Sequence, residues 1–492
     1  MIQPISRRTL LQASIAAGAT LLPDIPSFAA SDHLMQDAGK TVVPHQGPVD
    51  VTLRIGPVLV DVTEGRTIST IGYNGGAPGP LIRLREGKPV AVEIINDTDT
   101  PEFVHWHGQL VPAAVDGAAE ENSLMVPARG ALRYRFKPGP SGLRFVHTHV
   151  TAESDLHRGT YTGQHAPIYI EPVNDPGRYD QEVFLSTHEW EPFFTMEEME
   201  KEEEKDETQK KVEESVKAGQ SGEQKPNGWE VGYRLFSING RALGHGEPVR
   251  VRQGQRIMFH VLNASATENI KLALPGHRFF VVALDGNPVP TPKTVDVLQL
   301  ATAERIDAVV EMNNPGVWIL GTPKDDDRKG GMGIVVEYAG SGGEAQWAAP
   351  SKSVWDYTIF GGGQPSRKPD HVIPMVIGKI NGGKGGFDRW TINGKAYDEQ
   401  DAPTTLQKGL RYRLAFENRT DDTHPLHLHR NIFELTSVDG KMTNGVMKDV
   451  VLIKRFGRVD VDFTANQPGL TLFHCHQQLH MSYGFMKLFN VV

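Results

Sequence analysis

The sequence predicts an all-β protein built from several sandwich or barrel domains. Short runs of Val, Ile, Leu and Phe alternate with clusters of Gly, Pro, Asn and Asp, as in 51–55 and 89–96. This pattern is typical of short antiparallel strands. The 51 glycines and 33 prolines supply the turns between them. With 492 residues, the chain has room for about three domains.

A coarse internal repetition supports three modules. Each contains an Asn-Gly turn, at Asn74, Asn239 and Asn393, followed by a second turn centred on glycine. The repeats lie about 150 to 165 residues apart, which matches the usual size of a domain. Together with turn-rich stretches between the repeats, this spacing predicts domains at 45–172, 173–345 and 346–492.

One segment departs from the β pattern. Residues 196–225 are dense in Glu and Lys and contain few apolar positions. This composition predicts a solvated helix or a disordered insertion within the second domain. The alternative is a mobile lid over a pocket.

The N-terminus predicts export. Arg7 and Arg8 precede a mildly apolar stretch and then small residues up to Ala30, which resembles a Tat-type signal peptide at 1–30. We therefore expect the mature protein in the periplasm or outside the cell. No later apolar run approaches the roughly 20 residues needed to span a bilayer.

The overall charge excludes one class of partner. The formal net charge is −9, and charged residues make up 23% of the chain against 39% hydrophobic residues. A protein of this balance can build cores but lacks the concentrated basic surface that nucleic acids select. We expect no nucleic-acid partner.

The histidines are unevenly distributed along the chain. Of 19 histidines, ten fall in four tight clusters. Clustered imidazoles are costly through desolvation or mutual repulsion unless something holds them together, so this distribution indicates metal binding. The clusters are His105-Trp106-His107, His147-Thr148-His149, His424-Pro425-Leu426-His427-Leu428-His429, and His474-Cys475-His476 with His480.

Strand geometry gives the spacing a meaning. Residues i and i+2 of a strand point to the same side, so each His-x-His pair can present two imidazoles to one place. In His474-Cys475-His476 the same alternation puts both imidazoles on one side and the thiol on the other. One tripeptide could therefore join two metal centres.

Cys475 is the only cysteine of the chain, so no intramolecular disulfide can form. A lone thiol in an exported protein is either a buried apolar group or a metal thiolate. Imidazole and thiolate together suit copper, iron or zinc, but structural zinc sites usually use more than one cysteine. The His2Cys set available from His424, Cys475 and His480 matches a blue-copper site for electron transfer.

With these four motifs in this order, the sequence resembles the multicopper oxidases, the family of laccases and their three-domain bacterial relatives. The resemblance covers essentially the whole mature chain. It implies three cupredoxin-like Greek-key β-sandwich domains and four copper ions as cofactors, one of type 1, one of type 2 and two of type 3. The type 1 copper would lie in the third domain, and the other three would form a trinuclear cluster between the first and third domains.

The resemblance assigns eleven ligands to these copper ions. The type 1 ligands are His424, Cys475 and His480, and the type 2 ligands are His105 and His427. The type 3 pair takes His107, His147, His149, His429, His474 and His476. Electrons would enter at type 1, pass from Cys475 to its neighbours His474 and His476, and reduce O2 at the cluster, so these three residues are also expected to be catalytic.

Two further positions follow from the resemblance. The family's axial position lies ten residues after the cysteine, which is Phe485 here, with Met486 adjacent. A phenyl ring cannot bind copper, so we expect Phe485 to be an axial non-ligand and the type 1 potential to be high. Asp116 matches an acid position near the cluster and is expected to deliver protons, although it could equally be a turn residue before Gly117. Some relatives carry an acid just after the last histidine, where this chain has Met481.

The expected function is that of a laccase-like oxidase, which couples one-electron oxidation of phenols or aromatic amines to four-electron reduction of O2 to water. The alternative is a cuprous or other metal-ion oxidase for copper tolerance, although the 13 methionines form no dense cluster of the kind typical of that group. A copper-free assembly or binding protein is disfavoured by the complete ligand set. The expected partners are O2 and a small reductant; the sequence leaves the natural reductant and the oligomeric state open.

Overall fold

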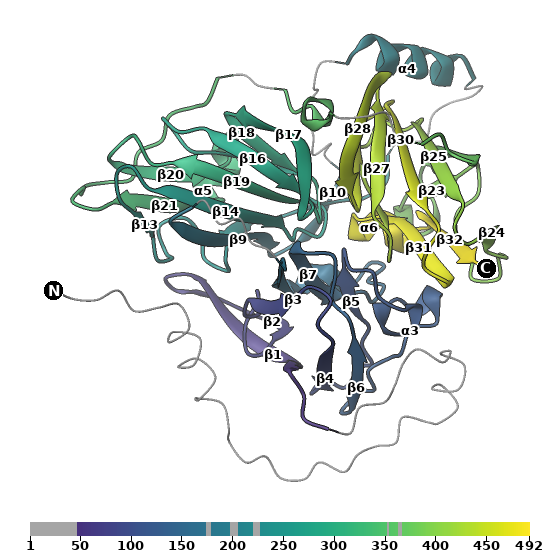
Figure 1. Cartoon of the computed structure of the whole chain (residues 1–492), viewed down its shortest axis with the longest axis horizontal. Coiled ribbons are helices and arrows are strands. Elements are labelled where there is room, and N and C mark those ends of the chain that lie inside the picture. Colours follow the sequence, from purple (N-terminus) through teal and green to yellow (C-terminus); the bar gives the residue numbers. More distant parts are fainter. Residues whose placement is uncertain (1–46, 174–178, 197–204, 220–226, 352–353, 363–366) are drawn as a thin grey trace.

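The computed structural model describes residues 47–492 except 174–178, 197–204, 220–226, 352–353 and 363–366. The predicted signal segment 1–30 and part of the 196–225 insertion lie outside the described residues. The described chain is dominated by β-strands, so the all-β prediction is confirmed. Figure 1 shows three packed sandwiches, the first in purple and blue below, the second in teal and green, and the third in yellow.

The first sandwich has two four-stranded sheets, ordered β2-β1-β4-β6 and β3-β8-β7-β5. Burial alternates along β1, which is typical of a strand with one face on a core. Trp106 of β5 is fully buried in that core. The elements are β1 (Val51–Thr63), β2 (Arg66–Tyr73), β3 (Ile82–Arg85), β4 (Val90–Asn96), β5 (Val104–His107), α3 (Ala113–Asp116), η1 (Ala119–Glu121), β6 (Ala131–Phe136), β7 (Gly142–Thr148), η2 (Gly159–Thr162) and β8 (His165–Glu171).

The second sandwich packs a six-stranded sheet, β12-β9-β14-β19-β16-β17, on a five-stranded sheet, β13-β21-β20-β15-β18. A two-stranded ribbon of β10 and β11 lies outside both. The elements are β9 (Gln181–Trp190), β10 (Phe193–Thr195), α4 (Glu207–Gly219), β11 (Glu230–Gly232), β12 (Leu235–Ile238), β13 (Val249–Val251), β14 (Arg256–Asn263), β15 (Ile270–Ala273), β16 (Phe279–Leu284), β17 (Asn287–Val295), β18 (Val297–Leu300), β19 (Arg305–Glu311), β20 (Val317–Gly321), α5 (Asp325–Lys329) and β21 (Gly333–Tyr338).

The third sandwich repeats this layout, with sheets β23-β22-β25-β30-β27-β28 and β24-β32-β31-β26-β29. The elements, with the connection that precedes them, are η3 (Tyr357–Phe360), β22 (His371–Ile380), η4 (Lys384–Gly386), β23 (Arg389–Ile392), β24 (Thr404–Leu406), β25 (Arg411–Asn418), β26 (His424–Leu428), β27 (Phe433–Val438), β28 (Lys441–Lys448), β29 (Val450–Ile453), β30 (Arg458–Thr464), β31 (Gly469–Cys475), α6 (Gln478–Ser482) and β32 (Met486–Val491).

The three Asn-Gly turns found in the sequence occupy equivalent places in the sandwiches. Asn74, Asn239 and Asn393 all have φ between 50° and 54°, a left-handed backbone that Asn tolerates and that is followed by a positive-φ Gly. Each asparagine Oδ1 accepts a hydrogen bond, at 2.6 to 2.8 Å, from a backbone N–H of the strand that pairs with the one before the turn: β1, β9 or β22. The repetition is therefore structural as well as sequential.

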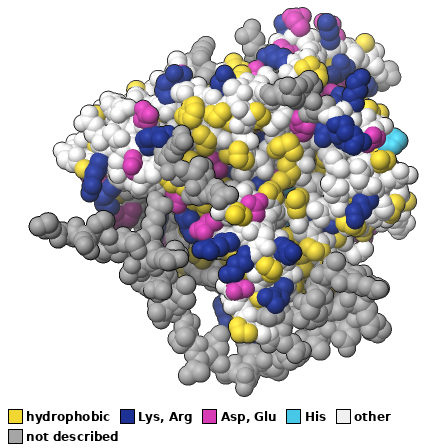
Figure 2. All heavy atoms as spheres, viewed as in Figure 1, with side chains coloured by type: hydrophobic (Ala, Val, Ile, Leu, Met, Phe, Trp, Pro, Cys, Tyr) yellow, Lys and Arg dark blue, Asp and Glu magenta, His cyan; other side chains and the backbone are white. Residues whose placement is uncertain are grey.

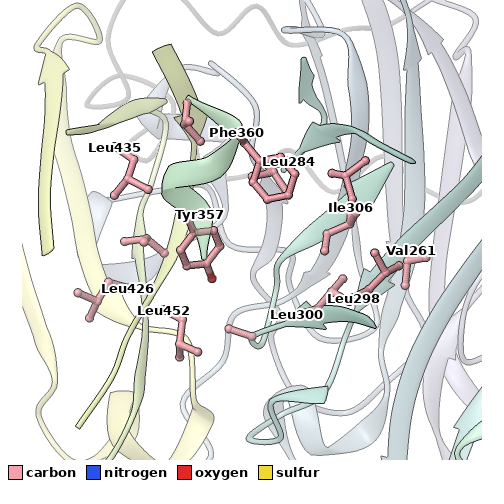
Figure 3. Packing of buried hydrophobic residues seen from close by; sticks show 14 of the residues in the cluster. Val261, Leu284, Leu298, Leu300, Ile306, Tyr357, Phe360, Leu426, Leu435 and Leu452 are labelled. Atoms are coloured by element: carbon pink, nitrogen blue, oxygen red, sulfur yellow. The ribbon is translucent and has the colours of Figure 1, made fainter. Parts of the chain in front are cut away.

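One apolar core runs through the second and third sandwiches. Tyr357 and Phe360 of η3 lie between them, with Leu284 and Ile306 on one side and Leu435 on the other, as Figure 3 shows. Burial of large apolar side chains between two sandwiches stabilises their contact, at about 25 cal/mol per Å² removed from water. The two sandwiches are held as one packed unit.

The charged insertion is helical where it is described. Thr208 and Gln209 of α4 hydrogen-bond the backbone carbonyls of Asp439 and Arg455 at 3.2 and 3.0 Å, so the helix lies on the third sandwich. In Figure 2, basic and acidic side chains are mixed at the top of the molecule, where α4 lies. Among the described residues, no helix combines the length and apolar character needed to cross a bilayer.

Candidate metal centres

Eight of the eleven predicted ligands converge where the first and third sandwiches meet, and the other three, His424, Cys475 and His480, lie within the third sandwich. His105 on β5 lies opposite His147 on β7, and His427 on β26 lies opposite His474 on β31. Figure 1 shows β5 and β31 at the contact between the two sandwiches. The other ligands lie on these strands or directly after them, except His480, which lies on α6.

The donor atoms fall into compact groups in which all lie within 4.8 Å of one another. One group contains the sole thiol, and the others share histidines and together form a larger cluster. Every member is buried. The groups are His424, Cys475 and His480; His105, His107 and His427; His107, His147 and His476; His149, His429 and His474; and His105, Asp116 and His429.

The hydrogen bonds of the larger cluster fit a metal ion. Nδ1 of His474 donates to the carbonyl of Cys475 at 2.8 Å, so its Nε2 carries only a lone pair. That Nε2 lies 3.0 Å from Nε2 of His429 and 3.5 Å from Nε2 of His149. His429 is arranged in the same way, because its Nδ1 donates to a carboxylate oxygen of Asp116. Lone pairs aimed at one another in a dry site require a cation between them.

Burial keeps these imidazoles in the form that binds metal. Desolvation holds the pKa of His107, His147, His149, His429 and His476 well below 6.5, and neighbouring histidines lower the pKa further. A neutral imidazole has a free lone pair, whereas imidazolium has none.

The smaller site lies on the opposite side of β31. Sγ of Cys475 lies 3.5 Å from Nδ1 of His480 and 3.8 Å from Nδ1 of His424, and the two Nδ1 atoms are 3.1 Å apart. Burial raises the pKa of the Cys475 thiol, so a thiolate here requires a bound cation. The donor set of two imidazoles and one thiolate is the one that copper sites for electron transfer use.

An apolar ring closes this smaller site. Phe485 is fully buried, and its ring centroid lies 4.9 Å from that of His424 at 70°. Its neighbour Met486 begins β32 and is only partly buried. The structure therefore places a phenyl group, which has no donor atom, beside the donor set.

Asp116 lies inside the larger cluster rather than in a solvated turn. Its carboxylate accepts from Nδ1 of His429 at 2.8 Å, and its backbone carbonyl accepts from Nδ1 of His105 at 2.9 Å. Sequence reasoning missed a second acid, Glu121 of η1, whose Oε1 lies 3.5 Å from Nδ1 of His429. Burial, and then the neighbouring Asp116, raise the pKa of Glu121 well above 4.5. Glu121 follows Asp116 by only five residues, and this proximity in sequence could have indicated a second acid near the cluster.

A pocket opens beside the smaller site, with His480 among its lining residues. Nε2 of His480 is buried and has no hydrogen-bond partner among the described residues. The pocket wall carries four carboxylic acids that the sequence did not connect with the site: Glu230, Glu268, Asp421 and Asp422. Met196, the first residue of the charged insertion, and Asn227, which follows that insertion, also line it.

The family comparisons agree with this geometry. Three sequence-family models, each described as multicopper oxidase, match residues 55–175, 203–336 and 374–492. Multicopper oxidase MmcO of Mycobacterium tuberculosis is 29% identical over 499 residues, covering 97% of this chain and 95% of that protein. Copper resistance protein A of Pseudomonas syringae pv. tomato is 28% identical over 332 residues, covering 62% and 52%.

Among solved structures, a bacterial laccase-like multicopper oxidase of Ochrobactrum sp. superposes with a TM-score of 0.68 at 21% identity, covering 90% of this chain and 97% of that one. This likeness identifies the sandwiches as cupredoxin-like. A multicopper oxidase match on each sandwich, together with this fold, shows that the chain belongs to the multicopper oxidases, copper-dependent oxidoreductases that use O2.

Proposed function

We propose that the protein is a laccase-like oxidase that takes single electrons from phenols or aromatic amines and delivers four to O2, giving water. One observation carries this proposal: His474-Cys475-His476 contributes its thiol to one donor set and its imidazoles to the other. This tripeptide joins the smaller site, which lies beside a pocket, covalently to the larger cluster. Such a link suits transfer of electrons from a reductant to O2.

We assign four copper ions to these donors. Type 1 takes His424, Cys475 and His480, type 2 takes His105 and His427, and the type 3 pair takes His107, His147, His149, His429, His474 and His476. When bound, copper would supply one-electron redox chemistry at the first site and reduction of O2 at the cluster. The chain itself holds neutral imidazoles in place, excludes water and positions Asp116 to move protons.

Export and domain organisation complete the proposal. The twin arginines at Arg7 and Arg8 support a Tat-type signal at 1–30 and a mature protein in the periplasm or outside the cell. Domain boundaries are proposed at 45–172, 173–345 and 346–492, in keeping with sheets that lie within 51–171, 181–338 and 371–491 of the described residues.

The first test is the copper content and colour of the purified protein. We expect four copper ions per chain, an intense absorption near 600 nm from thiolate-bound Cu(II), and O2 uptake with 2,6-dimethoxyphenol. A colourless protein that binds copper would contradict the type 1 assignment, and a blue protein without O2 uptake would contradict the oxidase.

The pocket beside His480 supports a substrate that loses a proton together with an electron. Glu230 lies in its wall, and burial and the neighbouring Asp422 raise the pKa of Glu230 well above 4.5. A phenol or aromatic amine becomes strongly acidic once oxidised, and a carboxylate with a raised pKa is a good acceptor for that proton. Lys379, which lies 2.7 Å from Asp421 and 2.9 Å from Asp422, offsets part of the negative charge.

We expect Glu230→Gln to lower kcat/KM for 2,6-dimethoxyphenol by about 10- to 100-fold, because the amide cannot accept the proton. Turnover of hexacyanoferrate(II), which releases no proton, should stay at or above the wild-type rate. Steady-state O2 uptake with both reductants measures the difference, and Glu311→Gln, an exposed acid on β19, is the matched control. An equal loss of kcat/KM with both reductants would indicate that Glu230 maintains the structure of the site and does not accept the proton.

The same pocket favours a second function, oxidation of Cu(I) or another metal ion. Its four carboxylic acids suit a cation, and one relative is named as a copper resistance protein. Comparing kcat/KM for Cu(I) with that for 2,6-dimethoxyphenol separates the two functions. A clear preference for Cu(I) would replace the laccase proposal.

A further inference from the structure

A buried ion cluster lies where the three sandwiches meet. It balances three cations against three carboxylates, and every member is at most 1% exposed. Charges are seldom buried in such number unless each is paired, because removal from water is costly. The members are Arg144 of β7, Asp285 between β16 and β17, Glu304 just before β19, Arg305 at the start of β19, Lys448 at the end of β28, and Asp449 between β28 and β29.

Asp449 lies at the centre of this ion cluster. Arg305 of the second sandwich grips it with two parallel bonds, Nη1 to Oδ1 and Nη2 to Oδ2, both at 2.6 Å. Arg144 of the first sandwich donates from Nη1 to Oδ2 at 3.2 Å. A two-pronged guanidinium contact fixes the orientation of a carboxylate as well as its position.

Asp449 also contacts two of the proposed copper ligands. Its Oδ1 accepts from Nε2 of His107 at 3.1 Å, and its backbone carbonyl accepts from Nδ1 of His427 at 2.7 Å. His107 therefore carries its proton on Nε2, and its Nδ1, which has no hydrogen-bond partner among the described residues, is left with a lone pair. His427 is fixed in the opposite tautomer.

Gly108 shows how closely the ion cluster is fitted to the ligands. A Cβ at this position would lie 2.6 Å from Nη2 of Arg305 and 2.7 Å from Oδ2 of Asp449. The residue also has φ of +77°, which favours glycine. The backbone that carries His107 thus rests directly on the Arg305–Asp449 pair.

We propose that Arg305 is a positioning residue for the trinuclear site, acting through Asp449 on His107 and His427. The second sandwich supplies none of the eleven predicted ligands, yet through Arg305 it sets the tautomer and orientation of one ligand from each of the other two sandwiches. This inference rests on the proposed copper assignment.

The test is Arg305→Lys, which keeps the positive charge and removes the two-pronged contact. We expect the absorption near 600 nm to persist, because the type 1 donors do not contact this ion cluster. Copper held by imidazoles alone should bind about 10- to 100-fold more weakly. Copper counted per chain after dialysis against a graded chelator, together with the EPR signal of the copper that has no thiolate ligand, measures this loss.

Arg411→Lys is the matched control, because Arg411 makes a comparable pair with Glu434 in the third sandwich without touching a histidine. Selective loss of cluster copper in Arg305→Lys but not in Arg411→Lys supports the proposal. If both variants retain the same amount of cluster copper, the proposal is overturned. It is also overturned if Arg305→Lys loses the 600 nm band and the cluster copper in the same proportion, because that result indicates general destabilisation.

If Arg305→Lys does not fold, Arg144→Lys is the second variant, because it loosens only one contact to Asp449. It should cause a smaller but still selective loss of cluster copper. If Arg144→Lys shows no such loss, the proposal is overturned. The wild-type protein separates this inference from the copper assignment. If wild type itself lacks cluster copper, the proposed function fails first.

Discussion

Cys475→Ser is expected to abolish the absorption near 600 nm and to lower oxidase turnover by at least about 10³-fold, as happens when one member of a concerted catalytic set is removed. Sγ of Cys475, the sole cysteine of the chain, lies 3.8 Å from Nδ1 of His424 and 3.5 Å from Nδ1 of His480. A serine hydroxyl neither gives the charge-transfer colour nor binds copper comparably. The visible spectrum and O2 uptake with 2,6-dimethoxyphenol measure both effects.

Copper content distinguishes this result from unfolding. Cys475→Ser should lose one copper ion per chain and keep the cluster copper, because the imidazoles of His474 and His476 belong to other donor groups. Phe259→Leu, a buried substitution on β14 of the second sandwich, which supplies none of the donors, controls for altered packing. Full oxidase turnover by Cys475→Ser would refute the electron path through this residue.

Asp116→Asn should slow the reaction with O2 by about 10²-fold or more, which is the usual loss when an acid–base group is removed. The amide can still accept from Nδ1 of His429 through its oxygen, so the geometry of the ligand is retained. It cannot take up and release protons at neutral pH. Stopped-flow mixing of the fully reduced protein with O2 measures the step directly.

An internal control is available for Asp116→Asn. Anaerobic bleaching of the 600 nm band by 2,6-dimethoxyphenol reports electron uptake at the Cys475 site, and it should match wild type. If O2 reoxidises reduced Asp116→Asn at the wild-type rate, Asp116 has only a structural role. Slowing of both steps would indicate damage that extends beyond the cluster.

The sequence predicted the fold class and the grouping of donors because both depend on local geometry. The period of two along a strand is enough to place His474 and His476 opposite Cys475, and the structure has this arrangement. The Asn-Gly turns repeat because only a few residue types accept the positive φ found at Asn74, Asn239 and Asn393. Such features need no knowledge of long-range packing.

The residues that surround the donors were not predictable in the same way. Arg305 and Asp449 are 144 positions apart in sequence, and neither belongs to a recognisable local pattern. Glu230 meets Asp422 and His480 only because the β10–β11 ribbon lies against the third sandwich. Charged residues at such positions are ordinary surface residues until tertiary packing buries them.

The division of the cluster between the first and last sandwiches has a consequence for biosynthesis. His105, His107, His147 and His149 leave the ribosome hundreds of residues before His427, His429, His474 and His476. A nascent chain therefore holds only half of the imidazoles for most of its synthesis and cannot retain the full complement of cluster metal. The full set of cluster copper can therefore be loaded only after the last sandwich has docked on the first.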